Sequence, residues 1–499
     1  MVFTSFAFLK FFIVVLLGLC LLPRRDYRQA FILAASAFLY AYWKPSYLLL
    51  LATPSLIDYI CALRIEQSQS EAVRRRWLIT SLVTNLGLLA YFKYTNFFLE
   101  TLSLILPVRL PRLDIVLPIG ISFFTFKTLS YTIDVYRREL PACRSLWRYA
   151  MFVTYFPELI AGPIVRASVF LPQITRSLRP SLQRAQVGMQ LILLGITKKL
   201  VFADRLALFV DRVFADPKIY SPSTAILAAI AYSIQIYCDF SGYSDMAIGI
   251  SKIIGFDLPE NFNMPYLACS ITEFWRRWHI TLSQWLRDYL YISLGGNRRG
   301  RLRTYVNLFI TMFLAGLWHG AGWTYVFFGC LHGIALVVHK IWRDSRKLAA
   351  APSLRARALS WAATYSFVCF SLIFFRAKTF SSAWIMIRKV CWLDSTGVIW
   401  TYTPLLLLVP LLIAGHILGV VAATRMDRNT RYAGPPDLWD FLYSGIAKRR
   451  FVLRPHRAAG IYILLPLHNF IGVFCFVSWA VLAFLFSSAR TNPFIYFQF

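Results

Sequence analysis

The chain has 499 residues, of which 58% are hydrophobic, 17% aromatic and only 15% charged. A soluble domain carries about a quarter charged residues, so this composition excludes an ordinary soluble enzyme and indicates a chain solvated mostly by lipid. The net charge is +30, from 53 Lys and Arg against 23 Asp and Glu. In so apolar a chain, that excess indicates cytoplasmic loops facing anionic lipid. Nucleic-acid binding is not expected, because neither a zinc-binding spacing nor a basic tract interleaved with aromatics is present.

The apolar runs predict an all-α polytopic membrane protein with roughly eleven to thirteen helices that cross fully or partly, since one crossing needs about 20 apolar residues. No linker divides the chain, so residues 1–499 are expected to form one integral-membrane domain. The candidate runs lie near 5–22, 29–43, 46–63, 77–93, 115–133, 147–165, 183–212, 224–252, 304–318, 321–341, 358–376, 402–424 and 460–487.

The first run predicts the orientation of the chain. It has little positive charge before it and no small-residue cleavage site, so it is not expected to be a cleaved signal. Arg24, Arg25 and Arg28 follow it, which places the N-terminus outside the cytoplasm. The basic loops at 64–76 and 296–303 are then cytoplasmic, and so is the polar stretch 425–458.

Carboxylates inside apolar segments need an explanation, because charge within a membrane is costly and is either functional or paired. Asp239 and Asp245 lie in "IQIYCDFSGYSDMAIGI". Glu158 lies in "YFPELIAGPIV", where the prolines and glycine predict a broken helix. A structural explanation is favoured over a chemical role: for Asp239 and Asp245 an internal ion pair with an arginine from elsewhere in the chain, and for Glu158 a backbone group or an arginine as partner.

The stretch 270–294, "SITEFWRRWHITLSQWLRDYLYISL", reads as one amphipathic helix. Its aromatic and leucine side chains recur at three- and four-residue steps, while Arg276 and Arg277 fall on other faces. This pattern is typical of a helix in the membrane interface or at the mouth of a cavity.

The stretch 316–322, "GLWHGAG", interrupts two apolar runs. A helix over 304–318 rises only ~22 Å, against a hydrocarbon core of ~30 Å, so we expect the turn to lie inside the bilayer. Irregular backbone at that depth is tolerated only inside protein or along a wet cavity, which places His319 in a tunnel or funnel.

Histidine supplies the best candidate for catalysis, because a near-neutral imidazole suits proton removal from an alcohol. His279 and His319 each follow a tryptophan, Trp278 and Trp318. His332 comes thirteen residues after His319; a helical hairpin would bring it near, although simple packing explains it better. The sequence contains neither a G-x-S-x-G elbow nor a P-loop, and its nine cysteines form no C-x-x-C pair, so no metal site or disulfide framework is expected.

Several long motifs in order resemble the membrane-bound O-acyltransferase family, and more closely its bacterial alginate O-acetyltransferase branch. They are "LPIGISFFTFKTLSYTIDVYRRE", "YFPELIAGPI", the run from "IYCDFSGYSD" to "ISLGGNRRG", "GLWHGAGWTYVFFGCLHG" and the terminal "FIYFQF". The match is strongest over 115–335. Cys238 replaces an expected aromatic residue and Glu158 an expected glutamine, which leaves the polysaccharide open.

The resemblance implies a ring of helices, some broken or interfacial, around a central tunnel, with His319 catalytic and His279 beside it. Trp278, Trp318, Asp239, Asp245, Glu158 and His332 would line or support that tunnel. Arg276, Arg277, Arg298 and Arg299 would hold donor phosphates, or else contact lipid headgroups. The donor would be acetyl coenzyme A or another acyl thioester, with no permanently bound cofactor.

The implied function is O-acetylation of an exported polysaccharide, alginate foremost, from the bacterial inner membrane and with a periplasmic partner protein. Cellulose, peptidoglycan or another surface glycan is an alternative acceptor. A transporter of acyl groups and a scaffold without chemistry are rival hypotheses of a different class.

Overall fold

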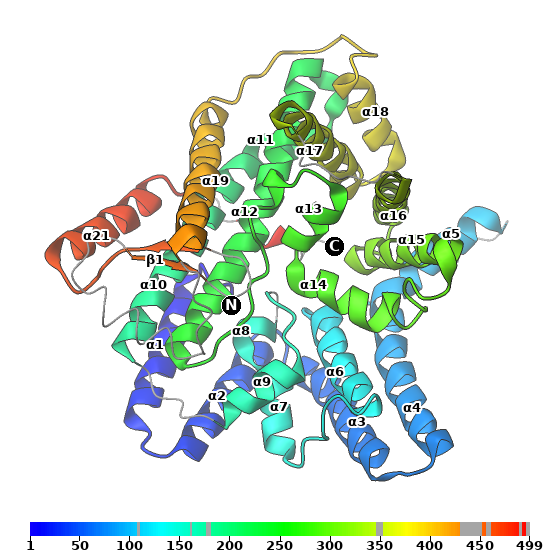
Figure 1. Ribbon diagram of the computed structural model, residues 1–499, viewed down its shortest axis with the longest axis vertical. Helices are drawn as coiled ribbons and strands as arrows, with labels where there is room; N and C mark the ends of the chain where they lie inside the picture. The colour runs from blue at the N-terminus through cyan, green and yellow to red at the C-terminus, as the bar shows by residue number, and fades with distance from the viewer. Residues whose placement is uncertain are drawn as a thin grey trace.

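The computed structural model describes residues 1–106, 110–159, 162–175, 181–345, 353–429, 452–455, 461–488 and 492–495. These residues are predominantly helical, apart from an antiparallel hairpin of β1 (Val452–Pro455) and β2 (Ile461–Leu464) (Figure 1). The α-helices are α1 (Phe6–Leu21), α2 (Arg25–Ala41), α3 (Tyr47–Gln67), α4 (Glu71–Leu89), α5 (Thr95–Ile105), α6 (Ile121–Tyr136), α7 (Leu146–Thr154), α8 (Phe156–Leu159), α9 (Ala167–Ile174), α10 (Leu182–Ile196), α11 (Asp204–Ala215), α12 (Pro222–Ile254), α13 (Ile271–Arg277), α14 (Ile280–Trp285), α15 (Gly300–His319), α16 (Trp323–Ser345), α17 (Leu354–Arg376), α18 (Phe380–Val390), α19 (Pro404–Asn429) and α21 (Phe470–Leu485). Three π-helical segments, η1 (Ala90–Tyr94), η2 (Thr197–Ala203) and η5 (Leu286–Tyr291), and two 3-10 turns, η3 (Pro217–Ile219) and η4 (Pro265–Leu267), complete them.

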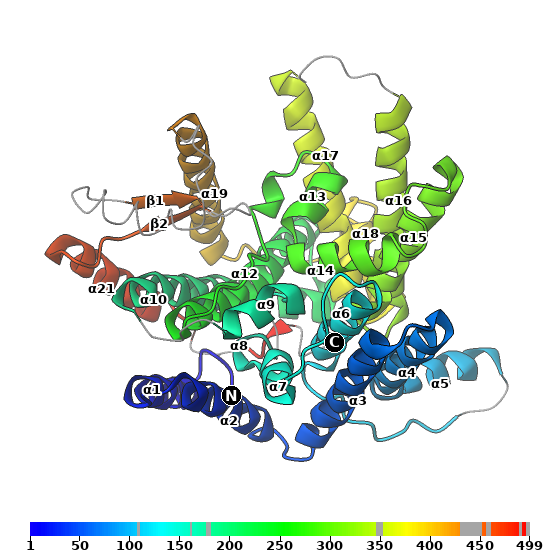
Figure 2. The same cartoon turned by 60° about the horizontal axis from the view of Figure 1, so that its bottom comes forward.

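Helix α12 is the central element of the fold and passes through the middle of the molecule (Figures 1 and 2). Its start is set by the Ser221 side chain, which accepts the Thr224 N–H, and by Pro222 at the first helical position. It ends at Gly255, whose φ of 118° is readily available only to glycine. In the most apolar 18-residue stretch of this 33-residue helix, 83% of the residues are buried, as expected of a helix surrounded by others.

Helix α10 lies against α12 at very short range. A Cβ on Gly195 would lie 2.4 Å from the Gly242 carbonyl oxygen, and one on Gly242 would lie 2.7 Å from the Gly195 oxygen. Small residues at facing positions let helix backbones approach in a membrane, where dispersion contacts replace the hydrophobic effect between helices. Directly after this contact the chain widens into η2, which places Lys198 and Lys199 against the acidic part of α12.

The predicted basic loops gather on one face. Glu66, at the end of α3, accepts the Ala142 N–H at 2.9 Å and pairs with Arg144 at 2.5 Å. Arg74 of α4 donates to the Tyr136 carbonyl at the end of α6. Arg137 donates to the Asp288 carbonyl of η5 at 3.1 Å. The α3–α4 loop, the α6–α7 loop and the segment before α15 therefore share one side of the protein, called the basic face below.

Four of the described helices are long and apolar enough to cross a membrane: α3, α12, α16 and α17. Shorter apolar helices at 6–21, 404–418 and 470–485 add partial crossings. The prediction of an all-helical polytopic membrane protein is confirmed.

Several predicted boundaries were wrong. The stretch 270–294 is not one helix but α13, α14 and η5, because the chain turns sharply at His279. The helix at 304–318 is really the 20-residue α15, about 30 Å long. The length argument that placed the following turn inside the bilayer therefore fails, although His319 is still buried.

Other differences reflect signals that hydropathy does not carry. The run 460–487 begins with strand β2 and becomes helical only at Phe470, while the polar stretch 425–458 holds the end of α19 and strand β1 within the described residues. Helix α18 was not predicted, because its apolar residues cover one face only and its length is 11 residues. The break expected near Glu158 is present, since Tyr155 separates α7 from α8.

Candidate functional site

His279 lies at the break between α13 and α14, in a strained backbone conformation. Its φ of 41° and ψ of 56° are left-handed, which a residue with a Cβ rarely adopts. Asn261, in the loop after α12, holds the turn: its carbonyl oxygen accepts the Ile280 N–H at 2.9 Å, and its side-chain oxygen accepts the Thr281 hydroxyl at 2.9 Å. The same side-chain oxygen lies 3.1 Å from His279 Nδ1. Strain of this kind persists where neighbours enforce it, and it collects at functional sites.

His319 is the last residue of α15, and side chains from the π-helical segment η1 hold that helix end. Tyr94 donates its hydroxyl to the Leu317 carbonyl at 2.9 Å. Lys93 Nζ lies 2.5 Å from the Trp318 carbonyl oxygen and 3.3 Å from that of His319. The last carbonyls of a helix have no intrahelical partner and carry its negative dipole end, so an ammonium group is well suited to this position.

Trp318 joins the two histidines. Its ring centroid lies 6.2 Å from that of His279 and 5.1 Å from that of His319, both in edge-on geometry. Phe126 of α6 stacks on the indole at 5.3 Å, and Trp285 stacks on the other side of Phe126 at 3.8 Å. The structure thus brings together the two histidines that sequence analysis singled out, although they lie on separate helices 40 positions apart in the chain.

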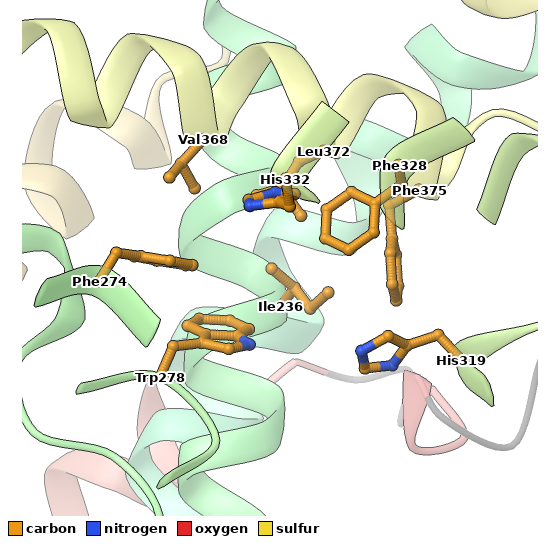
Figure 3. A pocket seen from close by; sticks show the side chains of 9 residues that line it. All are labelled: Ile236, Phe274, Trp278, His319, Phe328, His332, Val368, Leu372 and Phe375. Atoms are coloured by element: carbon orange, nitrogen blue, oxygen red, sulfur yellow. The ribbon is translucent and has the colours of Figure 1, made fainter. Parts of the chain in front are cut away.

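His319 also faces a narrow pocket between α12, α13, α16 and α17 (Figure 3). The space open to the centre of a water molecule there is only about 10 Å³, enough for about one water. The pocket is lined by Ile236, Phe274, Trp278, His319, Phe328, His332, Val368, Leu372 and Phe375.

His332 lines the same pocket but is fully hydrogen-bonded. Its Nδ1 accepts the Trp275 indole N–H at 3.2 Å. Its Nε2 lies 2.9 Å from the Ser371 hydroxyl, which itself donates to the Val368 carbonyl at 2.8 Å, so Nε2 must carry the proton. Both ring nitrogens are committed, and this geometry favours a structural role for His332.

The acids of the central helix are ion-paired. Asp239 lies 2.6 Å from Lys199, which also pairs with Asp204 at 2.9 Å. Asp245 lies 2.6 Å from Lys198. Both lysines come from η2, so the ion pairs are present but the expectation of arginine partners was wrong. Asp239 additionally accepts the Ile495 N–H at 2.7 Å, which ties the C-terminal segment 492–495 to the centre of the molecule.

Glu158 forms a further buried ion pair, at 2.6 Å from Lys127 of α6. Lys127 also lies over the Phe152 ring, 4.8 Å from its centroid. Glu158 is thus matched by a cation, as a buried charge requires.

The four arginines expected to hold donor phosphates do not form one cluster by their contacts. Arg277 is engaged by Glu273 at 2.9 Å and by the Asn263 carbonyl at 3.3 Å. Arg276 is exposed on α13, and Arg298 and Arg299 are exposed before α15. Within the described part of the chain, no group of three or more His, Cys, Asp or Glu residues could hold a metal ion.

Sequence reasoning missed Asn261, Lys93, Lys198 and Lys199. The lysines carried a usable signal, because each is a charge inside or beside an apolar run and therefore needs a partner. Asn261 carried none, since nothing local connects it to a histidine eighteen residues later.

Comparison with known proteins finds similar chains in one family of membrane enzymes. The model of the membrane-bound O-acyltransferase family matches residues 38–378. A probable alginate O-acetylase of Pseudomonas aeruginosa is 45% identical over 395 residues, covering 77% of this chain and 74% of the relative. A peptidoglycan O-acetyltransferase of Helicobacter pylori is 39% identical over 396 residues, covering 74% and 75% respectively. A teichoic acid D-alanyltransferase of Bacillus subtilis is 27% identical over 275 residues, covering 52% and 69%.

Proposed function

Since this chain belongs to the membrane-bound O-acyltransferase family and is a membrane O-acetyltransferase, we propose that it moves acetyl groups from a cytoplasmic thioester to an exported polysaccharide, alginate foremost. The observation that carries the proposal is the pair of buried histidines, His279 and His319, joined by Trp318 in the middle of a helical membrane protein. The alginate acceptor is supported by the relative from Pseudomonas aeruginosa.

In this mechanism His319 acts as general base. It takes the proton of the acceptor hydroxyl as the hydroxyl oxygen attacks the acetyl carbonyl carbon. The C–O bond forms, the carbonyl electrons move onto oxygen, and the tetrahedral intermediate then releases the thiolate. The imidazolium returns the proton to the sulfur, so one ester and one thiol replace one thioester and one alcohol. Burial serves this reaction because water in the site would hydrolyse the thioester.

The basic face is the side from which the donor enters. It carries the arginines at the facing ends of α3 and α4 and those of the α6–α7 loop, together with Arg298 and Arg299 before α15. By the positive-inside rule, this face lies on the cytoplasmic side of a bacterial inner membrane and the N-terminus lies in the periplasm. Acetyl coenzyme A or another acyl thioester meets these charges and, on α13, Arg276 and Arg277. A periplasmic partner protein then passes the acetyl group to the glycan.

A second acceptor, peptidoglycan, is favoured by one observation. The relative from Helicobacter pylori named for that substrate is 39% identical to this chain. Ester-linked acetate on purified cell-wall sacculi, rather than on soluble exported polymer, would decide for it.

The experiment that tests the function replaces His319 by Ala in a strain lacking the chromosomal copy. Base-labile acetate on the exported glycan should fall about 10²–10⁴-fold at matched protein level, since that is the contribution of a general base. The control is His339→Ala, which removes a half-buried histidine of α16 that contacts Thr272 of α13 and should acetylate normally. Wild-type acetylation by His319→Ala would leave the transporter or scaffold hypothesis in its place.

Orientation has its own test. In a variant with the exposed Cys20 and Cys391 replaced by Ser, single cysteines are placed at Gln69 and Asn297 on the basic face and at Ser395 beyond α18. A membrane-impermeant thiol reagent added to intact spheroplasts should label only Ser395→Cys. Labelling of the cysteines at positions 69 and 297 alone would show that the chain has the opposite orientation in the membrane.

A further inference from the structure

The side-chain amide of Asn261 has one possible orientation. The Thr281 backbone N–H, which can only donate, lies 3.3 Å from Asn261 Oδ1. The Thr281 hydroxyl donates to the same atom, and Asn261 Nδ2 faces the Ser244 hydroxyl at 3.3 Å. Turning the amide over would place two donors against each other at Thr281, so the atom beside His279 is an oxygen.

This orientation fixes the tautomer of neutral His279. Oδ1 of Asn261 accepts hydrogen bonds, so His279 Nδ1, 3.1 Å away, must donate one and carry the ring proton. Nε2 is left with a lone pair, is buried, and has no hydrogen-bond partner among the residues described. Neutral His279 is therefore an acceptor at Nε2, and it cannot be the group that donates to a thioester carbonyl oxygen.

The site nevertheless contains a donor of the required kind. Trp318 Nε1–H is buried, and no partner for it exists in the described part of the chain. A buried indole N–H usually finds a partner, and leaving one unpaired costs about 1–3 kcal/mol. Trp285 and Trp275, in the same aromatic region, both donate: one to the Phe126 carbonyl at 2.9 Å, the other to His332 at 3.2 Å. Trp318 is the exception among these three.

The position of Trp318 is held from several sides. Its carbonyl is fixed by Lys93 and its ring by the stack on Phe126. Gly316, in the same turn of α15, lies so close to α16 that a Cβ there would be 2.4 Å from the Tyr325 carbonyl oxygen. A rigidly held donor between two imidazoles is preorganised, which is what stabilisation of developing negative charge requires.

We propose that Trp318 is a catalytic residue whose indole N–H donates a hydrogen bond to the acetyl carbonyl oxygen of the thioester, while Asn261 is a positioning residue that keeps His279 Nε2 as an acceptor. The proposal rests on the acetyl transfer proposed above and assigns the oxyanion donor within it. As the acceptor oxygen bonds to the carbonyl carbon, negative charge grows on the carbonyl oxygen and the Trp318 bond strengthens. When the oxygen electron pair re-forms the C=O bond and the C–S bond breaks, the negative charge passes to the thiolate sulfur and the Trp318 hydrogen bond weakens again.

The test removes the N–H and keeps the ring. Trp318→Phe preserves an aromatic partner for Phe126, and incorporation of 3-(3-benzothienyl)alanine at position 318 preserves the shape of the indole with sulfur in place of N–H. The initial rate of base-labile acetate appearing on exported glycan, at matched protein level, should fall about 10²-fold in both, because removal of one oxyanion donor costs about 10²–10³-fold.

The matched control is Trp285→Phe, from the same aromatic stack. It loses a hydrogen bond to the Phe126 carbonyl but no unpaired donor, so its rate per folded protein should stay within a factor of a few of wild type. A wild-type rate with the benzothienyl residue would overturn the assignment of Trp318. If His319→Ala is then inactive, only this assignment fails; if His319→Ala is also active, the proposed acetyl transfer fails with it.

Discussion

Two regions on neighbouring sides of α12 hold a buried histidine among tryptophans, and they differ in one respect. Around His332, the ring nitrogens, the Trp275 indole and the Ser371 hydroxyl are all hydrogen-bonded. Where α14 meets the end of α15, Trp318 Nε1 and His279 Nε2 have no partner in the described structure. Burial and aromatic packing are the same in both places, so neither identifies the reaction site. The unpaired donor and the unpaired acceptor mark the reaction site, because a bound substrate would supply their missing hydrogen-bond partners.

Apart from the His319 and Trp318 variants, the largest effect expected within this comparison is that of His279→Ala, about 10²-fold on the acetylation rate. The substitution removes the acceptor at His279 Nε2 and relaxes the strained turn that positions it. The measurement is the rate of base-labile acetate appearing on exported glycan at matched protein level. A rate within a factor of two of wild type would put His279 in the same class as His332.

Substitutions of Asn261 should have the next largest effect, and they distinguish a role in positioning His279 from a role in packing alone. Asn261→Asp keeps an oxygen that accepts from His279 Nδ1 and should retain most activity. Asn261→Leu removes that acceptor and should lower the rate about 10-fold or more, since such outer-shell partners orient the reacting group.

Thr281→Val serves as the control for Asn261, because it removes the hydroxyl that donates to Asn261 and accepts the Ile164 N–H while keeping the His279 contact. Equal losses in Asn261→Asp and Asn261→Leu would mean that the amide supports the loop only.

A smaller effect, several-fold, is expected for Lys93→Met, which leaves the carbonyls of Trp318 and His319 without their cation. Lys93→Arg should restore part of the rate, whereas Tyr94→Phe, which loses one neutral bond to Leu317, should change it less. The order of the three rates is the measurement, and a Tyr94→Phe loss larger than that of Lys93→Met would contradict it.

The smallest catalytic effect is expected for Ser371→Ala, on the other side of the comparison. It should leave the rate per folded protein unchanged while lowering stability by about 1–3 kcal/mol, because His332 Nε2 is left buried without its acceptor. Thermal unfolding in detergent measures the stability, and the acetate assay measures the rate. A loss of rate without a loss of stability would show that the two regions share the chemistry.

The sequence predicted the helical membrane class, the two histidines and the need to pair the acids of α12. Composition and hydropathy decide the first, and the cost of polar groups in hydrocarbon decides the others. It failed at His279, where a helical periodicity continues through a residue that tertiary contacts force into a left-handed turn. It also failed to find Asn261 and Lys93, which reach the site from 18 and more than 200 residues away in the chain, because one sequence carries no record of such contacts.

The most direct test of the central claim compares two substitutions of the same kind in one pocket, His319→Gln and His332→Gln. Glutamine keeps a polar side chain of similar reach but cannot take up a proton. The rate of glycan acetylation at matched protein level is predicted to fall by at least about 10²-fold for His319→Gln, and to stay near wild type per folded molecule for His332→Gln. Equal rates for the two variants, or the greater loss in His332→Gln, would contradict the placement of the reaction at the end of α15.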